Sequence, residues 1–157
     1  SANTQLIAND ALEYFLLIND NTVADSKQAA LKQFAKGDYL LYQNRNQDAV
    51  AQFQSILKNF KGQEIEAVTL LRLGAIYEKL GDFNLALSQY QAIIDHHSDG
   101  IYTDEALFFS AEIYSKKLQE PEKAKPLYEK IIFNHQDSIH FVEARNKFRQ
   151  LRGDTNL

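Results

Sequence analysis

Residues 70–93 read LLRLGAIYEKLGDFNLALSQYQAI, and this stretch decides the fold. Its second half carries Ala86, Tyr90 and Ile93 at offsets of 0, +4 and +7. Residues at these offsets lie on one face of an α-helix, so they form the buried stripe of a single helix. Another helix precedes it and ends at the Gly81-Asp82 turn, where Gly81 supplies a left-handed residue and Asp82 an N-cap. The stretch therefore predicts a pair of helices joined by a short turn.

The same stripe of Ala, an aromatic residue and Ile occurs four times along the chain. The copies are Ala11-Phe15-Ile18, Ala49-Phe53-Ile56, Ala86-Tyr90-Ile93 and Ala124-Tyr128-Ile131. Their alanines, at positions 11, 49, 86 and 124, follow one another at a nearly constant interval. A fixed period of this length is typical of stacked repeats. We therefore predict an all-α solenoid of antiparallel helix pairs, each made of an A helix followed by a B helix that carries the stripe.

The repeat sets the expected organisation of a single domain over residues 1–157. Its expected parts are a lone B helix at 4–22, repeats at 26–61, 64–98 and 103–136, and a terminal A-like helix at 141–152. The first A helix has two candidate small residues, Ala35 and Gly37, and its register stays open. The chain has no Met even at position 1, so we expect it to be a fragment of a longer protein.

Composition excludes several classes of function. The net charge is −4 with acids and bases interspersed, so nucleic acid is not an expected partner; only the last helix is locally basic. The chain has no Cys and therefore no disulfide or thiol nucleophile. It has no apolar run of about 18 residues, so we expect no membrane insertion by this segment. It also has no phosphate loop, dinucleotide fingerprint or nucleophile elbow, which predicts neither a cofactor nor catalysis.

The histidines follow the repeat rather than a metal site. His97 and His135 stand one repeat apart and occupy the position of Phe60. His96 shares its position with Asn59 and Asn134, which predicts C-terminal helix caps there. We therefore expect no metal site and no catalytic residues.

The pattern of small residue, Tyr, Gly-Asp turn, Ala and aromatic resembles the tetratricopeptide repeat (TPR). The residues at the spacings of that family are Leu70, Leu73, Gly74, Tyr77, Ala86 and Tyr90. The repeats here exceed the usual length of about 34 residues. In this they are similar to bacterial cell-envelope TPR proteins of the TolA-binding and outer-membrane-assembly lipoprotein type, although the Pro of that family is missing. The resemblance implies a right-handed superhelix, protein binding along a concave face, and a periplasmic or cell-envelope location.

Family geometry also implies which residues line that face. The groove-lining residues would be Leu71, Ala75, Glu78, Lys79, Phe108, Glu112 and Ser115. Alternatively, Leu71 and Phe108 pack against a neighbouring repeat or a capping helix. The A helices whose register is clear carry no Asn, which argues against the carboxylate clamp of chaperone-tail-binding TPR domains.

Three functions remain open from the sequence. The leading interpretation is a scaffold that binds a peptide or a partner protein. A second is a structural spacer or oligomerisation arm of a larger bacterial envelope protein, with self-association through exposed array ends. A third is a helper domain of a multidomain enzyme, which contributes no catalytic groups of its own.

Overall fold

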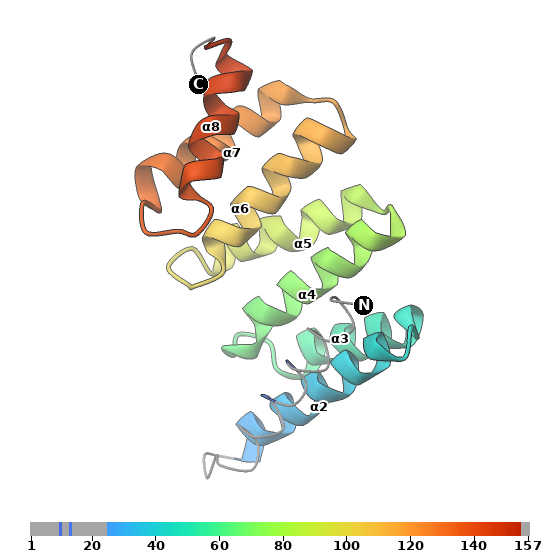
Figure 1. Cartoon of the computed structure of the whole chain (residues 1–157). Coiled ribbons are helices and arrows are strands. Elements are labelled where there is room, and N and C mark those ends of the chain that lie inside the picture. The colour runs from blue at the N-terminus through green and yellow to red at the C-terminus, as the bar shows by residue number, and fades with distance from the viewer. Residues whose placement is uncertain (1–9, 11–12, 14–24, 155–157) are drawn as a thin grey trace. The chain divides into compact units, whose positions relative to one another are not determined.

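The structure is a computed structural model that describes residues 10, 13 and 25–154 (Figure 1). Over this part the chain forms α-helices, one π-helical turn and no strand. In chain order the elements are α2 (Asp25–Tyr42), α3 (Asn46–Asn59), α4 (Ile65–Leu80), α5 (Phe83–His96), α6 (Thr103–Glu112), η1 (Ile113–Lys117), α7 (Pro121–Asn134) and α8 (Phe141–Arg152). The lone B helix expected at 4–22 lies outside the described residues, apart from Asp10 and Glu13.

The stripe found in the sequence is the core of every described B helix. These helices are α3, α5 and α7, and the A helices are α2, α4, α6 with η1, and α8. The nine stripe residues are all fully buried, at 0% exposure: Ala49, Phe53, Ile56, Ala86, Tyr90, Ile93, Ala124, Tyr128 and Ile131. The predicted all-α repeat of helix pairs is therefore confirmed.

Contacts between residues gather into two compact units, Ser1–Ile76 and Tyr77–Leu157, which divide within α4. In the first unit α2 packs on α3, and Gly37 is the point of close approach. A Cβ added to Gly37 would lie 2.6 Å from two atoms of the Phe53 ring. Gly37 is buried whereas Ala35 is half-buried, so Gly37 is the small residue of the first A helix. This contact fixes the register that the sequence left open.

The second unit stacks α5, α6, α7 and α8 in sequence order (Figure 1). Its core combines Leu107 and Ala111 of α6 with Tyr128 and Ile131 of α7 and Ala144 of α8. Between α6 and α7 the helix widens into the π-turn η1, where the Leu118 amide donates to the Ile113 carbonyl at 3.0 Å. This extra residue makes the interval from Ala111 to the left-handed Gln119 one residue longer than that from Gly74 to Gly81.

The turns between A and B helices share one backbone feature. Each contains a residue with positive φ: Asn44 at 60°, Gly81 at 80° and Gln119 at 57°. The left-handed residue predicted at Gly81 is thus present in all three described pairs, although only one of them uses glycine. Asp82 occupies the N-cap position as predicted, but its side chain makes no capping hydrogen bond.

The ends of the B helices also repeat, one residue later than the sequence suggested. Asn59, His96 and Asn134 are the last helical residues, and the caps are Phe60, His97 and His135. Each cap amide donates to the carbonyl of the stripe Ile four residues earlier. The C-caps predicted at the asparagine position were therefore wrong by one residue.

Candidate binding face

The A helices carry the predicted groove residues at several depths. Within the second unit, Glu78, Glu112 and Ser115 are half-buried, Lys79 is exposed and Phe108 is buried. Within the first unit, Leu71 is half-buried and Ala75 is exposed. Leu71 and Ala75 are four residues apart on α4, so they share one helix face. Among the charged members of this set, Glu78 and Glu112 have side-chain partners.

Two carboxylates of the A helices hold the hydroxyl groups of the buried stripe tyrosines. Tyr128 donates to Oε1 of Glu112 at 2.6 Å, and Tyr90 donates to Oε2 of Glu78. A buried hydroxyl without a partner is costly, so each bond satisfies the one polar atom of its stripe. The stripe aromatics thus connect the core to the A-helix face.

Sequence reasoning missed these pairs, although a signal for them exists. The stripe aromatic is Tyr in the two repeats whose hydroxyl meets a Glu, and it is Phe53 in the first unit. Glu78 and Glu112 do not occupy equivalent positions, since Ala75 is the equivalent of Glu112 and Ser115 that of Glu78. The carboxylate has moved by one helical turn between repeats, which hides the pairing from a comparison by register.

Burial and neighbouring charges shift the pKa values of the two carboxyls in opposite directions. Burial alone raises the pKa of Glu112, but hydrogen bonds from Lys116 and Tyr128 outweigh it, and the net pKa is lowered. Burial raises the pKa of Glu78, and nearby Glu112 adds to the rise against the hydrogen bond from Tyr90 and the charge of Lys117. The face therefore holds two different carboxyl groups. The ionised form is favoured at Glu112, whereas burial disfavours the ionised form of Glu78.

Charges of both signs surround Glu112. Its Oε2 pairs with the Nζ atom of Lys116, one turn further along the chain. From α8, the charge of Lys147 lowers the pKa of Glu112 and that of Glu143 raises the pKa of Lys116. The face of the second unit is therefore a mixed-charge surface built from α4, α6 with η1, and α8.

Phe108 lies beneath the start of α8. The ring of His140 stacks on the Phe108 ring with centroids 4.3 Å apart and planes 11° apart, and the Tyr128 ring meets Phe108 edge-on at 6.1 Å. His140 directly precedes α8, and its Nε2 atom is buried without a hydrogen-bond partner. Phe108 thus contacts the helix that follows its own repeat, and its part in a groove stays a prediction.

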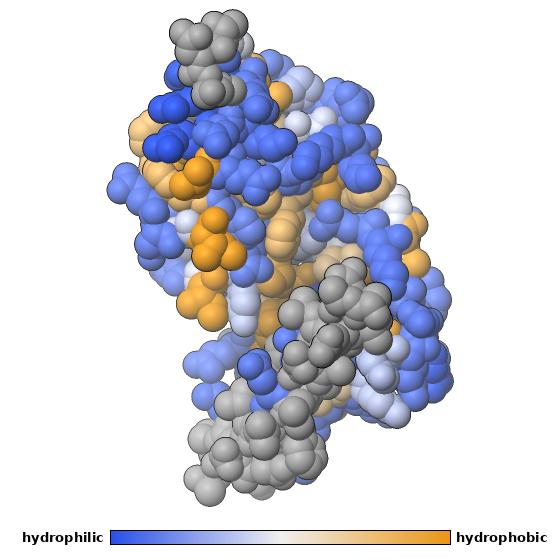
Figure 2. Space-filling model, viewed as in Figure 1, coloured by the Kyte–Doolittle hydropathy of each residue, from blue (hydrophilic) through white to orange (hydrophobic). Residues whose placement is uncertain are grey.

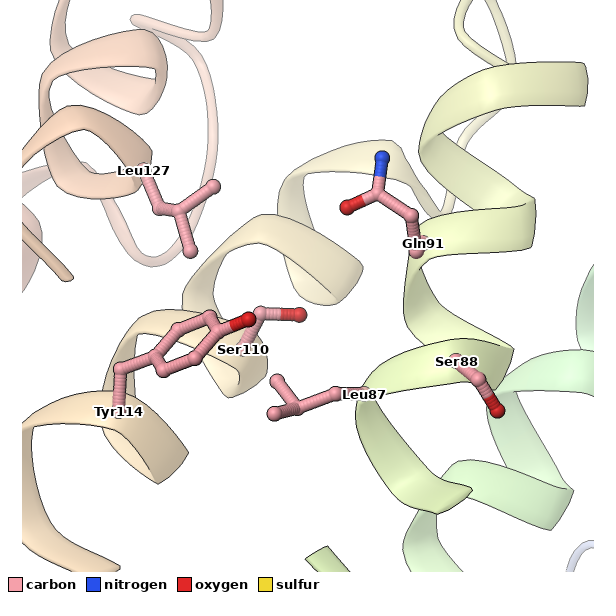
Figure 3. A pocket seen from close by; sticks show the side chains of 6 residues that line it. All are labelled: Leu87, Ser88, Gln91, Ser110, Tyr114 and Leu127. Carbon is pink, nitrogen blue, oxygen red and sulfur yellow. The ribbon is translucent and has the colours of Figure 1, made fainter. Parts of the chain in front are cut away.

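A shallow pocket of about 330 Å³ lies between α5, α6, η1 and α7 (Figure 3). It is lined by Leu87, Ser88, Gln91, Ser110, Tyr114 and Leu127. Two of its polar groups are already engaged: Ser88 donates to the Leu85 carbonyl at 2.8 Å and Gln91 donates to Asp95 at 2.8 Å. The lining has no charged group and no convergent set of donors, so the pocket offers no catalytic arrangement.

The described residues hold no cluster of three or more His, Asp or Glu side chains placed to bind a metal ion. Among the helices described here, none combines the length and apolar character needed to cross a bilayer.

The helix pairs give the described residues the architecture of a helical-repeat protein. In agreement, the family model described as tetratricopeptide repeat matches residues 69–100, which include the second half of α4 and all of α5. No curated protein matches the chain. The family match supports a TPR protein, and TPR repeats generally mediate protein–protein interaction.

Proposed function

We propose that this chain is a non-catalytic protein-interaction scaffold that binds a peptide or a partner protein along its A-helix face. The observation that carries the proposal is the state of Glu112. Its side chain is only 16% exposed, yet a tyrosine hydroxyl and a lysine hold it ionised in a fixed orientation. A half-buried, prearranged charge serves recognition better than packing, because burying it costs free energy.

The hydrogen-bonding capacity of Glu112 is not exhausted. Its Oε1 accepts from Tyr128 and its Oε2 contacts Lys116, while each carboxylate oxygen has two acceptor sites. A backbone amide or a cationic side chain of a bound segment can therefore add a bond without displacing either partner. Glu78 reinforces this preference, because a cation nearby would offset the burial that raises its pKa.

The first test selects peptides from a random library on the folded chain and maps the best binder by amide chemical shifts. We expect the largest shifts at Lys79, Glu112 and Ser115. Because Phe108 is buried, replacing it would disturb the core, so Ser115→Arg is the better variant to block the face. Gln91→Ala, in the shallow pocket, is the control. Shifts confined to the pocket, or full binding by Ser115→Arg, would refute the assignment of the face.

The proposal extends to a bacterial cell-envelope protein, and this extension rests on the sequence resemblance alone. Cell fractionation of the parent organism tests it with an antibody against residues 25–154. Recovery in the periplasmic or membrane fraction is expected, and exclusive recovery in the cytoplasm would contradict it.

A further inference from the structure

The loops that precede α6 and α8 carry the same exposed pentapeptide pattern, His-x-Asp-x-Ile. The pattern occupies residues 97–101 as HSDGI and, one repeat later, residues 135–139 as HQDSI. Ile101 is 80% exposed and Ile139 is 87% exposed, the two highest values among the large apolar residues described. Asp99 and Asp137 are exposed two residues before each isoleucine.

The two loops have the same backbone structure. In each, the histidine caps the preceding B helix, and the amide three residues later donates to its carbonyl. That distance is 2.9 Å for Gly100 to His97 and 3.0 Å for Ser138 to His135. The hydroxyl of Thr103 also donates to the His97 carbonyl at 2.7 Å. These bonds hold the loops in fixed turns.

A side-chain bond also joins the loop before α8 to the start of α6. Ser138 donates its hydroxyl to Asp104, which follows Ile101 by three residues. The two loops therefore lie at one edge of the second unit, where apolar side chains are visible on both of them (Figure 2). We call the surface made by Asp99, Ile101, Asp137 and Ile139 the isoleucine edge.

The hydrogen bond that closes these loops does not require isoleucine, and a third loop of the chain provides the evidence. The loop before α4 is closed by the same hydrogen bond, with the Gln63 amide donating to the Phe60 carbonyl at 3.1 Å, although its backbone differs at Gly62, whose φ is 79°. Its residue equivalent to Ile101 is Glu64, whose side chain is 86% exposed. A charged side chain is thus compatible with this hydrogen bond, so closing the loop in this way does not require the two isoleucines.

We infer that the isoleucine edge is a second docking surface, and that it takes a protein segment combining aliphatic with Lys or Arg side chains. Rigid, exposed aliphatic side chains bind at low entropic cost because they are already ordered. The charge of the edge selects the partner: residues 95–105 and 135–143 contain six carboxylates and no Lys or Arg. The same charge disfavours an anionic bilayer, which attracts basic segments. None of its four residues belongs to the predicted A-helix face.

The test uses fluorescent helical peptides of about five turns and measures anisotropy at two salt concentrations. One peptide is an amphipathic helix of Leu and Lys, and its counterpart replaces every Lys with Glu. We expect binding of the Leu/Lys peptide only, weakening as salt rises. Ile101→Gln/Ile139→Gln should raise its Kd about tenfold or more, as loss of two central apolar anchors does at other interfaces. Asp99→Asn/Asp137→Asn should reduce the salt dependence.

Matched variants separate this surface from others. Leu85→Gln removes an apolar side chain that is 48% exposed on α5, outside the edge, and should leave the Kd unchanged. Circular dichroism should show unchanged helicity for the isoleucine, aspartate and Leu85→Gln variants, since their replaced side chains are exposed. Ser115→Arg, which blocks the A-helix face, should also bind the Leu/Lys peptide normally.

Three outcomes would overturn the inference. One is a Kd of the double isoleucine variant equal to that of the parent chain, or no binding of the Leu/Lys peptide at all. Another is loss of binding in Ser115→Arg alone, which would assign the peptide to the A-helix face and favour the proposed function instead. The third is binding to vesicles of anionic phospholipid that the isoleucine variant loses, which would make the edge a membrane contact.

Discussion

Replacing Gly37 with Ala tests the closest helix approach in the first unit. An added Cβ would lie 2.6 Å from Cε1 and Cζ of Phe53 and 3.0 Å from Cε2. The Phe53 ring is fully buried, and the Phe34 ring stands edge-on beside it with centroids 5.2 Å apart. The ring therefore has no free space to move into, so α2 and α3 must separate slightly.

Two opposing contributions decide the size of the effect. In an open helix interior, Gly to Ala would stabilise by about 0.5–1 kcal/mol through backbone entropy. Overpacking a filled core costs about 1–3 kcal/mol. The contact is far inside van der Waals distance, so we expect the cost of overpacking to exceed the entropic gain. The net loss should be about 1–2 kcal/mol in the free energy of unfolding.

The assay is urea unfolding followed by far-ultraviolet circular dichroism, with the double variant Gly37→Ala/Phe53→Leu as the control. Leu is smaller than the ring, so the double variant should be more stable than the sum of the single changes by about 1 kcal/mol. A Gly37→Ala chain that is more stable than the parent would show that the close approach does not exist. Simple additivity in the double variant would show that Phe53 is not what the methyl group meets.

Other substitutions and a pH series test the remaining contacts. Gly81→Ala should destabilise by about 1–2 kcal/mol in urea unfolding, because φ is 80° although nothing lies within 4 Å of an added Cβ; an unchanged stability would refute the left-handed turn. Tyr128→Phe should lower the free energy of unfolding by about 1 kcal/mol in the same assay, because it removes the hydroxyl that donates to Glu112 at 2.6 Å. It should also raise the pKa of Glu112 in a carboxyl NMR titration. An unshifted pKa would contradict the pair. Burial, partly offset by Arg72, raises the pKa of Asp38 to about 6 from 3.8, so the folded state binds the extra proton between these values. Stability should therefore fall as pH rises from about 4 to 6, and this dependence should disappear in Asp38→Asn.

The core could be predicted from sequence because the same types of residue fill it at the same positions of each repeat. Ala86, Tyr90 and Ile93 recur at fixed offsets and all become fully buried. Helical periodicity alone places such residues on one face, and the recurrence identifies that face as the interior. The first A helix was harder, because Ala35 and Gly37 are both small and only the position of the Phe53 ring distinguishes them.

The binding face could be predicted only in part, because its groups do not recur in register. Glu78 and Glu112 accept from equivalent tyrosines but sit one helical turn apart on their own helices. Their pKa shifts depend on three-dimensional neighbours such as Lys117 and Lys147, which no spacing rule selects. Phe108 likewise depends on His140, which lies far from it in the sequence, beyond the whole of α7, and stacks on it in space.

Comparison between repeats therefore separates two kinds of residue once the backbone is known. A position that holds the same residue type wherever the backbone recurs serves the fold, as the stripe Ile does at each B-helix end. A position whose residue changes while the same backbone hydrogen bond forms is not needed for that bond. Glu64 and Ile101 each directly follow the residue whose amide closes the loop, yet one side chain is charged and the other apolar. An exposed Glu side chain is well solvated, whereas an exposed Ile side chain leaves apolar surface in contact with water, which is unfavourable. Two isoleucines kept in the same exposed turn, each beside an aspartate, are therefore better explained by a contact outside the chain than by any contact within it.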